Sequence, residues 1–336
     1  MSIPLQLALT LLTAWPAASH PDSCNVPVGG RPVPVEFVGD RVFVRWQLRG
    51  HGMLSLYTDT GGGLLALYPE AVRRLGLVPD TTAWTRGAYH GVTVVVKIPR
   101  TLGDSAVPPI PSTDSAAVEF FVQTTEPPPE DEIGSAWDGR LGSIWFADRV
   151  WTFDYPNQRL YFNGTTPVGP SAAACWTPLG FQTDSAGHRI NSFPRITARI
   201  DREPIQFILD TGARTTLTDS AWRALGTGEP RHRAASFITK ERFDAWHSHH
   251  PEWLVISNAE YGDSLPMIRV PVVEVAGHGI GPVWFTQRPD RNFREFMSQY
   301  MDRPIEGALG GSAWRSVTLI IDYPRARAAV VTSSGR

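Results

Sequence analysis

Short runs of alternating or β-branched residues dominate the hydrophobic pattern of this chain, and such runs predict strands. Segments with a helical period are short, and they follow two Asp-Thr-Gly tripeptides and two later Gly-x-Leu-Gly turns. The 30 Gly and 29 Pro residues supply many turn positions. We therefore predict a mainly β protein, with strands at Arg41 to Gln47, Val92 to Ile98, Ala117 to Val122, Arg195 to Ile200, Ile205 to Leu209, Ile268 to Val275 and Val317 to Asp322.

One set of motifs runs twice along the chain in the same order. It comprises a Cys, an Asp-Thr-Gly tripeptide, a helix-like segment ending in Leu-Gly, a Gly-x-Leu-Gly turn and an Asp-Tyr-Pro turn. The members are Cys24, Asp59-Thr60-Gly61, Leu75-Gly76, Gly139 to Gly142 and Asp154-Tyr155-Pro156, then Cys175, Asp210-Thr211-Gly212, Leu225-Gly226, Gly307 to Gly310 and Asp322-Tyr323-Pro324. The two halves differ mainly in the stretch between the first and last motifs, which is longer in the second. This repetition predicts two similar lobes related by pseudo-two-fold symmetry.

The repeat also sets the expected domain boundaries. We place an N-terminal lobe at 24–162, a Gly- and Pro-rich linker at 163–174 and a C-terminal lobe at 175–332. Residues 1–19 are typical of an export signal, because an apolar run is followed by small residues. That run is short for a bilayer span. We expect an exported protein, periplasmic or secreted, with no stable membrane insertion after signal cleavage.

Composition narrows the possible partners. The formal net charge is −2 over 336 residues, which gives no sign of nucleic-acid binding.

Three histidines lie close together in the longer second half: His247, His249 and His250. No Cys or regular ligand spacing accompanies them, so a solvated polar loop is favoured over a metal site. We predict no metal and no cofactor.

The two Asp-Thr-Gly tripeptides are the candidate chemistry of this chain. Each one ends an apolar run: Leu54 to Thr58 before Asp59, and Phe207 to Leu209 before Asp210. Equivalent loops from two matching halves suggest two carboxylates placed face to face. Such a pair shares one proton, and it activates a water molecule by acting as base and acid together.

This arrangement resembles the aspartic peptidases. The apolar Asp-Thr-Gly loop with its later apolar-apolar-Gly turn resembles the family in general. The Leu-Gly helix end and the Asp-Tyr-Pro strand are similar to the retropepsin-like branch, including its bacterial members, and two copies in one chain resemble the two-lobed pepsins. The resemblance covers Cys24 to Val331. It implies a two-lobed acid-protease barrel fold in which Asp59 and Asp210 are the catalytic pair at the floor of a cleft.

The resemblance also implies roles for the neighbours of the two acids. Thr60 and Thr211 are expected to bond across the lobes, and Gly61 and Gly212 to allow close approach of the backbone. The next residues are Gly62 and Ala213, where pepsins usually carry Ser or Thr. Because that hydroxyl helps to keep the pair acidic, we expect a less acidic pH optimum than that of a gastric-type enzyme.

A substrate-covering flap is expected in the first half after Asp59. The segment Gly87 to Gly91 precedes a predicted strand and is the best candidate. Tyr89 resembles the flap tyrosine of pepsins, although an ordinary hairpin tyrosine fits equally well. Cys24 and Cys175 are equivalent under the repeat and are therefore the candidate disulfide. Two separate buried thiols are the alternative.

The predicted function is an aspartic endopeptidase that hydrolyses polypeptide substrates. Both halves come from one chain, so a monomer suffices to build the site. One alternative is a catalytically weak or silent peptide-binding module, which Gly62-Gly63 after the first motif leaves open. A glycoside hydrolase with two carboxylates is a further rival. It does not explain why both acids have the same Asp-Thr-Gly context.

Overall fold

The computed structural model describes residues 29–86, 89–99, 101–103, 107–108, 117–123, 137–163, 176–226, 228 and 230–332, with the backbone alone for 82–86 and 89–93. The export signal, most of the predicted linker, and both Cys24 and Cys175 lie outside these residues and stay predictions. None of the helices in the described ranges has the length and apolar character needed to cross a membrane.

The first half of the chain builds one eight-stranded sheet. In spatial order its strands are β2 (Val35–Val38), β3 (Arg41–Leu48), β4 (Gly52–Asp59), β9 (Gly139–Gly142), β5 (Ala66–Leu67), β8 (Ala117–Val122), β7 (Tyr89–Pro99) and β6 (Pro79–Arg86). Strand β4 runs parallel to β9, and β5 runs parallel to β8, whereas β5 and β9 are antiparallel.

The second half builds a nine-stranded sheet on the same plan. Its strands are β18 (Val255–Ile256), β19 (Met267–Val270), β22 (Val283–Arg288), β17 (Ser236–Thr239), β23 (Gly307–Leu309), β14 (Glu203–Leu209), β13 (Arg195–Ile200), β20 (Val273–Val275) and β21 (His278–Ile280). Strand β14 runs parallel to β23, and β17 runs parallel to β22, whereas β17 and β23 are antiparallel.

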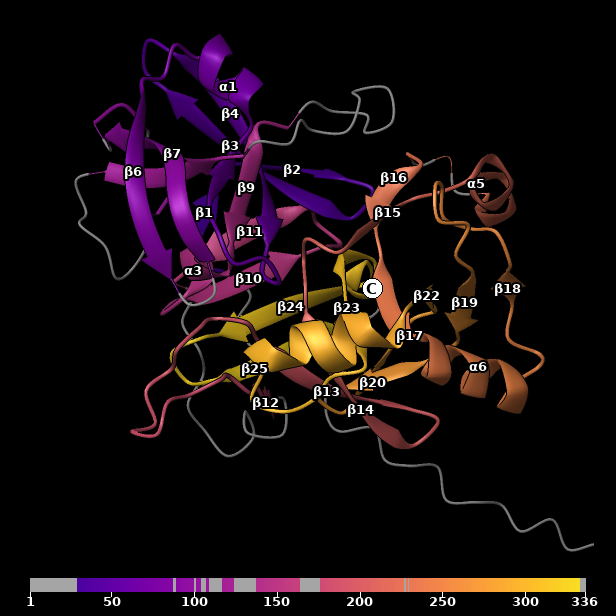
Figure 1. Ribbon diagram of the computed structural model, residues 1–336. Coiled ribbons are helices and arrows are strands. Elements are labelled where there is room, and N and C mark those ends of the chain that lie inside the picture. Colours follow the sequence, from indigo (N-terminus) through magenta and orange to yellow (C-terminus); the bar gives the residue numbers. More distant parts are fainter. Residues whose placement is uncertain are drawn as a thin grey trace, which may run out of the picture.

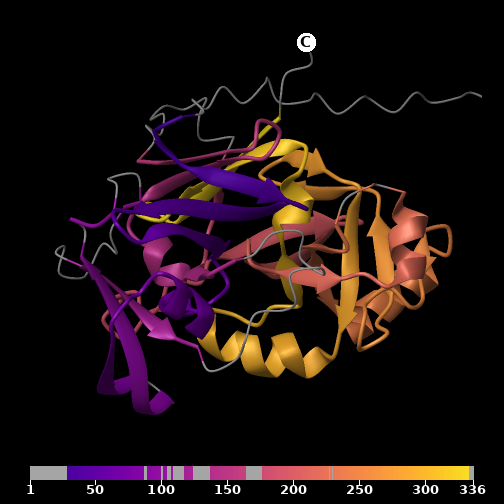
Figure 2. The ribbon, with the colours of Figure 1, turned by 90° about the horizontal axis from the view of Figure 1, so that it is seen from above.

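A third sheet of six strands takes strands from both halves. Its order is β1 (Arg31–Val33), β11 (Arg159–Phe162), β10 (Val150–Asp154), β24 (Val317–Asp322), β25 (Arg327–Thr332) and β12 (Trp176–Pro178). Antiparallel β10 and β24 meet at its centre. In Figure 1 the first-half strands gather on one side, the second-half strands on the other, and β10 and β24 lie between them. Figure 2 shows the same two groups from above.

Strand pairing establishes the pseudo-two-fold relation without reference to sequence. The order β3-β4-β9-β5-β8-β7-β6 in the first half corresponds to β13-β14-β23-β17-β22-β19-β18 in the second. The prediction of a mainly β, two-lobed fold with this symmetry is confirmed. Within the described residues neither large sheet closes on itself, because each ends in two edge strands, β2 and β6 in one, β18 and β21 in the other.

The helices are short, as predicted, but one expected equivalence fails. They are α1 (Pro69–Arg74), α3 (Ser143–Phe146), α5 (Asp219–Leu225), α6 (Lys240–His249), the π-helical η1 (Asn292–Phe296) and the 3₁₀ turns η2 (Met297–Tyr300) and η3 (Gly311–Trp314). The Leu-Gly ends behave alike, since Gly76 and Gly226 both have left-handed φ values of 58° and 59°. However, α1 follows β5, whereas the helix that follows the corresponding β17 is α6. Helix α5 therefore has no topological counterpart among the described residues of the first half.

Helix α5 belongs to an additional segment of the second half, residues 214–234, which we call the excursion. It consists of β15 (Arg214–Thr216), α5 and β16 (His232–Ala234), and its two strands pair with each other as a separate ribbon. The ribbon reaches the first half, because the amide of Ala234 donates to the carbonyl of Gly39 at 2.8 Å. Figure 1 shows β15 and β16 rising beside β2.

Local chemistry explains why Asp-Tyr-Pro occurs twice. Asp154 and Asp322 end the two central strands, and each carboxylate accepts a hydrogen bond from the backbone amide three residues later, at 3.3 Å from Asn157 and 3.1 Å from Arg325. These side chains hold the hairpin turns. Tyr155 and Tyr323 are buried beside them. The motif therefore stabilises the shared sheet.

One predicted strand is divided in the structure. Ile268 to Val275 was expected to be continuous, but it forms β19 and β20, with a break at Pro271 and Val272. Proline has no amide hydrogen to donate to a strand ladder. The two pieces consequently join different parts of the sheet, since β19 pairs with β22 and β20 pairs with β13.

Candidate active site

The ends of two equivalent strands position Asp59 and Asp210. Asp59 is the last residue of β4 and pairs with Gly142 of β9. Asp210 directly follows β14, and its amide donates to the carbonyl of Leu309 at 2.9 Å. Each acid then begins a tight turn: Gly62 N donates to Asp59 O at 3.1 Å, and Ala213 N donates to Asp210 O at 3.2 Å. The two loops therefore repeat the same local structure.

The threonines of the two tripeptides join the loops across the pseudo-two-fold axis. Thr60 N donates to Thr211 Oγ1 at 3.2 Å, and Thr211 N donates to Thr60 Oγ1 at 2.9 Å. Thr60 Oγ1 also donates to the carbonyl of Leu209 at 2.7 Å. Both threonines are buried, at 0% and 1% exposure. Reciprocal bonds in a dry environment hold one loop at a defined position relative to the other.

The same loops bring the two carboxylates together. A methyl group placed on Gly212 would overlap Asp59 Oδ1, and one placed on Gly61 would overlap the carboxylate of Asp210. Each acid thus lies against the glycine of the opposite tripeptide. Both acids line one open cavity of about 570 Å³, in which Asp59 is 7% exposed and Asp210 is half-buried. We call Asp59 and Asp210 the dyad.

Burial and mutual repulsion change the acidity of the dyad. Burial, and after it the charge of Asp59, raise the pKa of Asp210 to about 7, and the bond from Gly212 N to Asp210 Oδ1 at 2.9 Å opposes that rise. Two close carboxylates cannot both ionise cheaply, so one proton is retained between them. The titration belongs to the pair rather than to one residue.

Gly212→Ala tests this close contact. The added methyl group would displace the Asp59 carboxylate, since Oδ1 occupies its position. A displacement of about 1 Å at a reacting group costs roughly 10²-fold in rate, and we expect a loss of that size in kcat for peptide hydrolysis. Gly63→Ala is the matched control, because its methyl group would meet only Phe193 Cζ at an ordinary 3.6 Å. Equal activity in both variants would contradict the described geometry.

A tyrosine and an arginine make polar contacts with Asp59. The residues that directly follow the two tripeptides have no polar side chain with which to do so. Gly62 and Ala213 carry no hydroxyl, as read from the sequence. Instead, the Tyr57 hydroxyl donates to Asp59 Oδ2 at 3.3 Å, and Arg140 Nη1 lies 3.8 Å from the same oxygen. Tyr57 shares a face of β4 with Asp59, being two residues earlier. Asp59 therefore receives its hydroxyl contact from β4 and not from the residue after its tripeptide.

Aromatic rings pack around Tyr57, and the guanidinium of a second arginine, Arg214, lies against two of these rings. Trp137 packs against Tyr57 at 4.3 Å and Tyr68 at 5.8 Å between ring centroids. The Arg214 guanidinium, from β15, lies 5.0 Å from the centroid of Trp137 and 5.4 Å from that of Tyr57. Arg214 Nη1 also donates to the Tyr57 hydroxyl at 3.3 Å. The excursion thus contacts the first half beside the dyad.

Two further ionisable side chains line the cavity: Arg288, which is ion-paired, and His232, which is neutral. Arg288 binds Glu260 in a bidentate pair, at 2.5 Å to Oε2 and 2.7 Å to Oε1, and Thr215 donates to Glu260 Oε1 at 2.8 Å. His232 is buried, with Nδ1 2.7 Å from Thr216 Oγ1. Burial first, then the positive charges of Arg41 and Arg214, lower the pKa of His232 to about 3, so the ring is neutral at ordinary pH.

The six predicted residues of the two tripeptides lie together in the structure, and the side chains of the other predicted site residues lie outside the described residues. Asp59, Asp210 and their tripeptides form one site, as described above. For Tyr89, the backbone lies at the start of β7, opposite Arg86 of β6, as expected for a hairpin. Its side chain and the turn residues 87–88 lie outside the described residues, so the flap role stays a prediction.

The histidine cluster has a different setting from the one expected. His247 and His249 are exposed at the end of helix α6, which replaces the predicted loop. His250 stacks on Trp253 at 4.1 Å, and its Nε2 lies 3.0 Å from Asp201. These contacts give His250 a structural role at the end of the helix.

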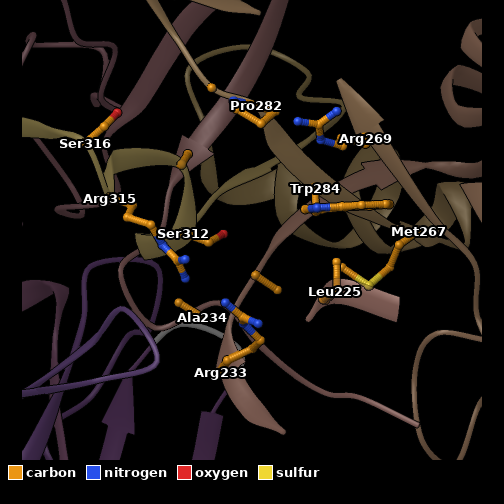
Figure 3. A pocket seen from close by; sticks show the side chains of 13 residues that line it. Leu225, Arg233, Ala234, Met267, Arg269, Pro282, Trp284, Ser312, Arg315 and Ser316 are labelled. Atoms are coloured by element: carbon orange, nitrogen blue, oxygen red, sulfur yellow. The ribbon is translucent and has the colours of Figure 1, made fainter. Parts of the chain in front are cut away.

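A second cavity, of about 380 Å³, lies in the second half and contains no dyad residue. Figure 3 shows the indole of Trp284 beside the guanidinium of Arg269, with Ser312 and Arg315 across from them. No Asp, Glu, His or Cys lines this cavity among the described residues, so it has no acid–base pair of its own.

Comparison with known proteins does not identify the function of this chain, so a function has to be inferred from the geometry of the site. No protein-family model matches the chain, and no curated protein matches its sequence. Among solved structures, the aspartic proteinase from Irpex lacteus is similar at 13% identity and a TM-score of 0.48, with 92% of this chain and 98% of that chain covered. A similarity at this level identifies neither activity nor substrate.

Proposed function

We propose that this protein is an aspartic endopeptidase that hydrolyses peptide bonds with a water molecule activated by Asp59 and Asp210. The observation that carries the proposal is the paired carboxylates in one open cavity, each against the glycine of the opposite Asp-Thr-Gly loop. The raised pKa of Asp210 supports it, because such a pair holds one proton while the other carboxylate stays ionised.

The proposed mechanism uses both states of the dyad at once. The ionised carboxyl takes a proton from water, and that water attacks the carbonyl carbon of an extended polypeptide. The protonated carboxyl donates to the carbonyl oxygen, which gives a tetrahedral diol with no covalent enzyme intermediate. Return of a proton to the amide nitrogen then breaks the C–N bond. The threonine bonds between the loops keep the two carboxyls aligned through these steps.

The pH dependence of hydrolysis follows from the raised pKa of Asp210. We expect activity to persist into weakly acidic solution and to fall as pH rises through about 7, because the retained proton is then lost. A pH–rate profile for kcat/KM checks this. A profile that peaks below about pH 3 would contradict it.

The same pKa makes stability depend on pH in a defined direction. The folded protein holds the shared proton more tightly than the unfolded chain does. Its contribution to stability is therefore complete at low pH and is lost as pH rises from the usual range of an aspartic acid through about 7. Urea unfolding across this range should show the loss in the wild type and a smaller loss in Asp210→Asn.

Digestion of a peptide library across pH, with Asp210→Asn as the control, tests the proposed function. Cleavage by the wild type that is blocked by a pepstatin-type inhibitor supports the aspartic mechanism and excludes a glycoside hydrolase. Binding of peptides without cleavage at any pH would instead support a peptide-binding module.

We also propose that the protein acts as a monomer after export. Sedimentation and fractionation of cells that express the full chain test these two points.

A further inference from the structure

The excursion places a second positive charge, that of Arg214, in the cavity of the dyad, in addition to Arg140 of the first half. Strands β5 and β17 hold equivalent places in the two sheets, yet residues 214–234 precede only β17. A methyl group on Gly142 would meet the backbone of Leu64, and one on Gly310 would meet that of Ala235, which confirms the equivalence around the insertion. The excursion begins at Arg214, directly after the turn that follows Asp210.

Arg214 presents a positive charge to the cavity. It lines the same cavity as the dyad and is half-buried. Its guanidinium rests on the rings of Trp137 and Tyr57 and donates to the Tyr57 hydroxyl. No carboxylate of the described ranges pairs with it in the structure. A planar guanidinium held against aromatic rings keeps its remaining N–H groups available in a fixed orientation.

The other charges of the cavity are already balanced. Arg288 is paired in a bidentate manner with Glu260, and Arg140 lies within ion-pair distance of Asp59. His232 is neutral, as its lowered pKa indicates. The dyad carries one negative charge when it shares its proton. Among the described lining residues, Arg214 is therefore the cation that has no paired carboxylate, and its charge also acts on Asp210, whose pKa it lowers.

We propose that Arg214 forms a subsite for an acidic side chain of the polypeptide substrate, a Glu or Asp next to the bond that is cleaved. This inference rests on the proposed function, since it names the substrate class of the same site. A carboxylate accepts two parallel hydrogen bonds from a guanidinium, and the partly dry, aromatic surroundings strengthen the pair. A neutral amide of the same shape leaves the guanidinium without a counter-charge.

Matched peptides measure this selectivity. The cleavage site is first located by mass spectrometry, and peptide pairs are then made that carry Glu or Gln at each position next to it. Hydrogen bonds to a charged group imply that wild-type kcat/KM is about 10- to 100-fold higher for the Glu peptide at one of these positions. Arg214→Gln should reduce this ratio to about one. Arg269→Gln is the matched control, because that guanidinium lines the separate cavity of Figure 3.

The Glu-to-Gln ratio separates substrate recognition from a merely structural role. If Arg214 only supported Tyr57 and Asp59, then Arg214→Gln would lower kcat for both peptides equally and leave their ratio unchanged. Arg214→Lys retains the charge and should retain part of the preference, which keeps the test valid should Arg214→Gln fail to fold. A wild-type ratio near one at every position, or an unchanged ratio in Arg214→Gln, would overturn the proposal.

Binding measurements keep the inference separate from the catalytic proposal. Peptides in which the scissile bond is reduced to a CH₂–NH group bind without being cleaved. If the wild type cleaves no peptide, Glu and Gln pairs are made instead from the library peptide that binds most tightly; tighter binding of the Glu peptide then supports the acidic subsite, whereas the endopeptidase proposal fails. Equal binding of both analogues would overturn the subsite itself.

Discussion

Asp210→Asn is expected to abolish peptide hydrolysis while leaving the fold intact. Asn keeps the shape of the side chain but neither takes a proton from water nor donates one as an acid does. General acid–base groups contribute about 10²- to 10⁴-fold each, and Asp210 serves a pair that works as a unit, so we expect kcat to fall by about 10³-fold or more. Initial rates on the best library peptide measure this, and circular dichroism checks the fold.

The companion variants make this result specific. Asp59→Asn should cause a loss of similar size, because the pair shares one proton and either member is required. Asp263→Asn is the control, since Asp263 is exposed and lies outside the cavity lining. Cleavage that survives unchanged in both dyad variants would show that other residues perform the chemistry.

Thr60→Val is expected to destabilise the protein as well as to impair it. Thr60 Oγ1 donates to Leu209 O and accepts from Thr211 N, and the side chain is fully buried. Val has nearly the same shape, so the change removes two hydrogen bonds without creating a cavity. Each buried polar group left unsatisfied costs about 1–3 kcal/mol, and we expect a loss of about 2–5 kcal/mol in the free energy of unfolding. Urea unfolding measures it.

A neighbouring threonine provides the matched control. Thr58 lies in β4, two residues before Thr60, and is equally buried, yet its Oγ1 has no hydrogen-bond partner among the described residues. Thr58→Val replaces an unsatisfied hydroxyl with a methyl group and should be neutral or slightly stabilising. Equal destabilisation by the two variants would mean that the bonds between the loops contribute little.

Repetition made the centre of the site predictable from sequence. Asp59 and Asp210 occur in identical contexts after apolar strands, and identical local structure in two halves predicts symmetric placement. Strand prediction succeeded where the pattern is strong, as at Ala117 to Val122. The connection of helices and strands within the sheets was harder to predict from the sequence. Helices α1 and α5 carry the same local signals, but strand pairing alone shows that α5 belongs to an insertion.

Two features of the sequence mark neighbours of the dyad: short spacing along a strand and position within a repeated motif. Tyr57 lies two residues before Asp59 on a strand, and alternation alone places it on the same face. Arg140 occupies the variable position of the Gly-x-Leu-Gly motif, which was expected to be a turn but forms β9 beside β4. In contrast, His232, Glu260 and Arg288 reach the cavity from distant strands and loops. No local pattern marks such residues, because tertiary packing alone brings them together.

The central pairing of β10 with β24 has a consequence for when activity first arises. Those strands belong to opposite halves, so the sheet between them closes a very long loop of chain. Contacts of this kind form slowly, since the entropy of closure must be lost before the contacts compensate for it. A ribosome-bound or truncated chain without β24 therefore lacks the pairing that joins the two halves, even when it already contains both Asp59 and Asp210. We expect peptide-hydrolysis activity to appear only at the end of folding. The newly made polypeptide is then not cleaved by its own active site while it is still unfolded.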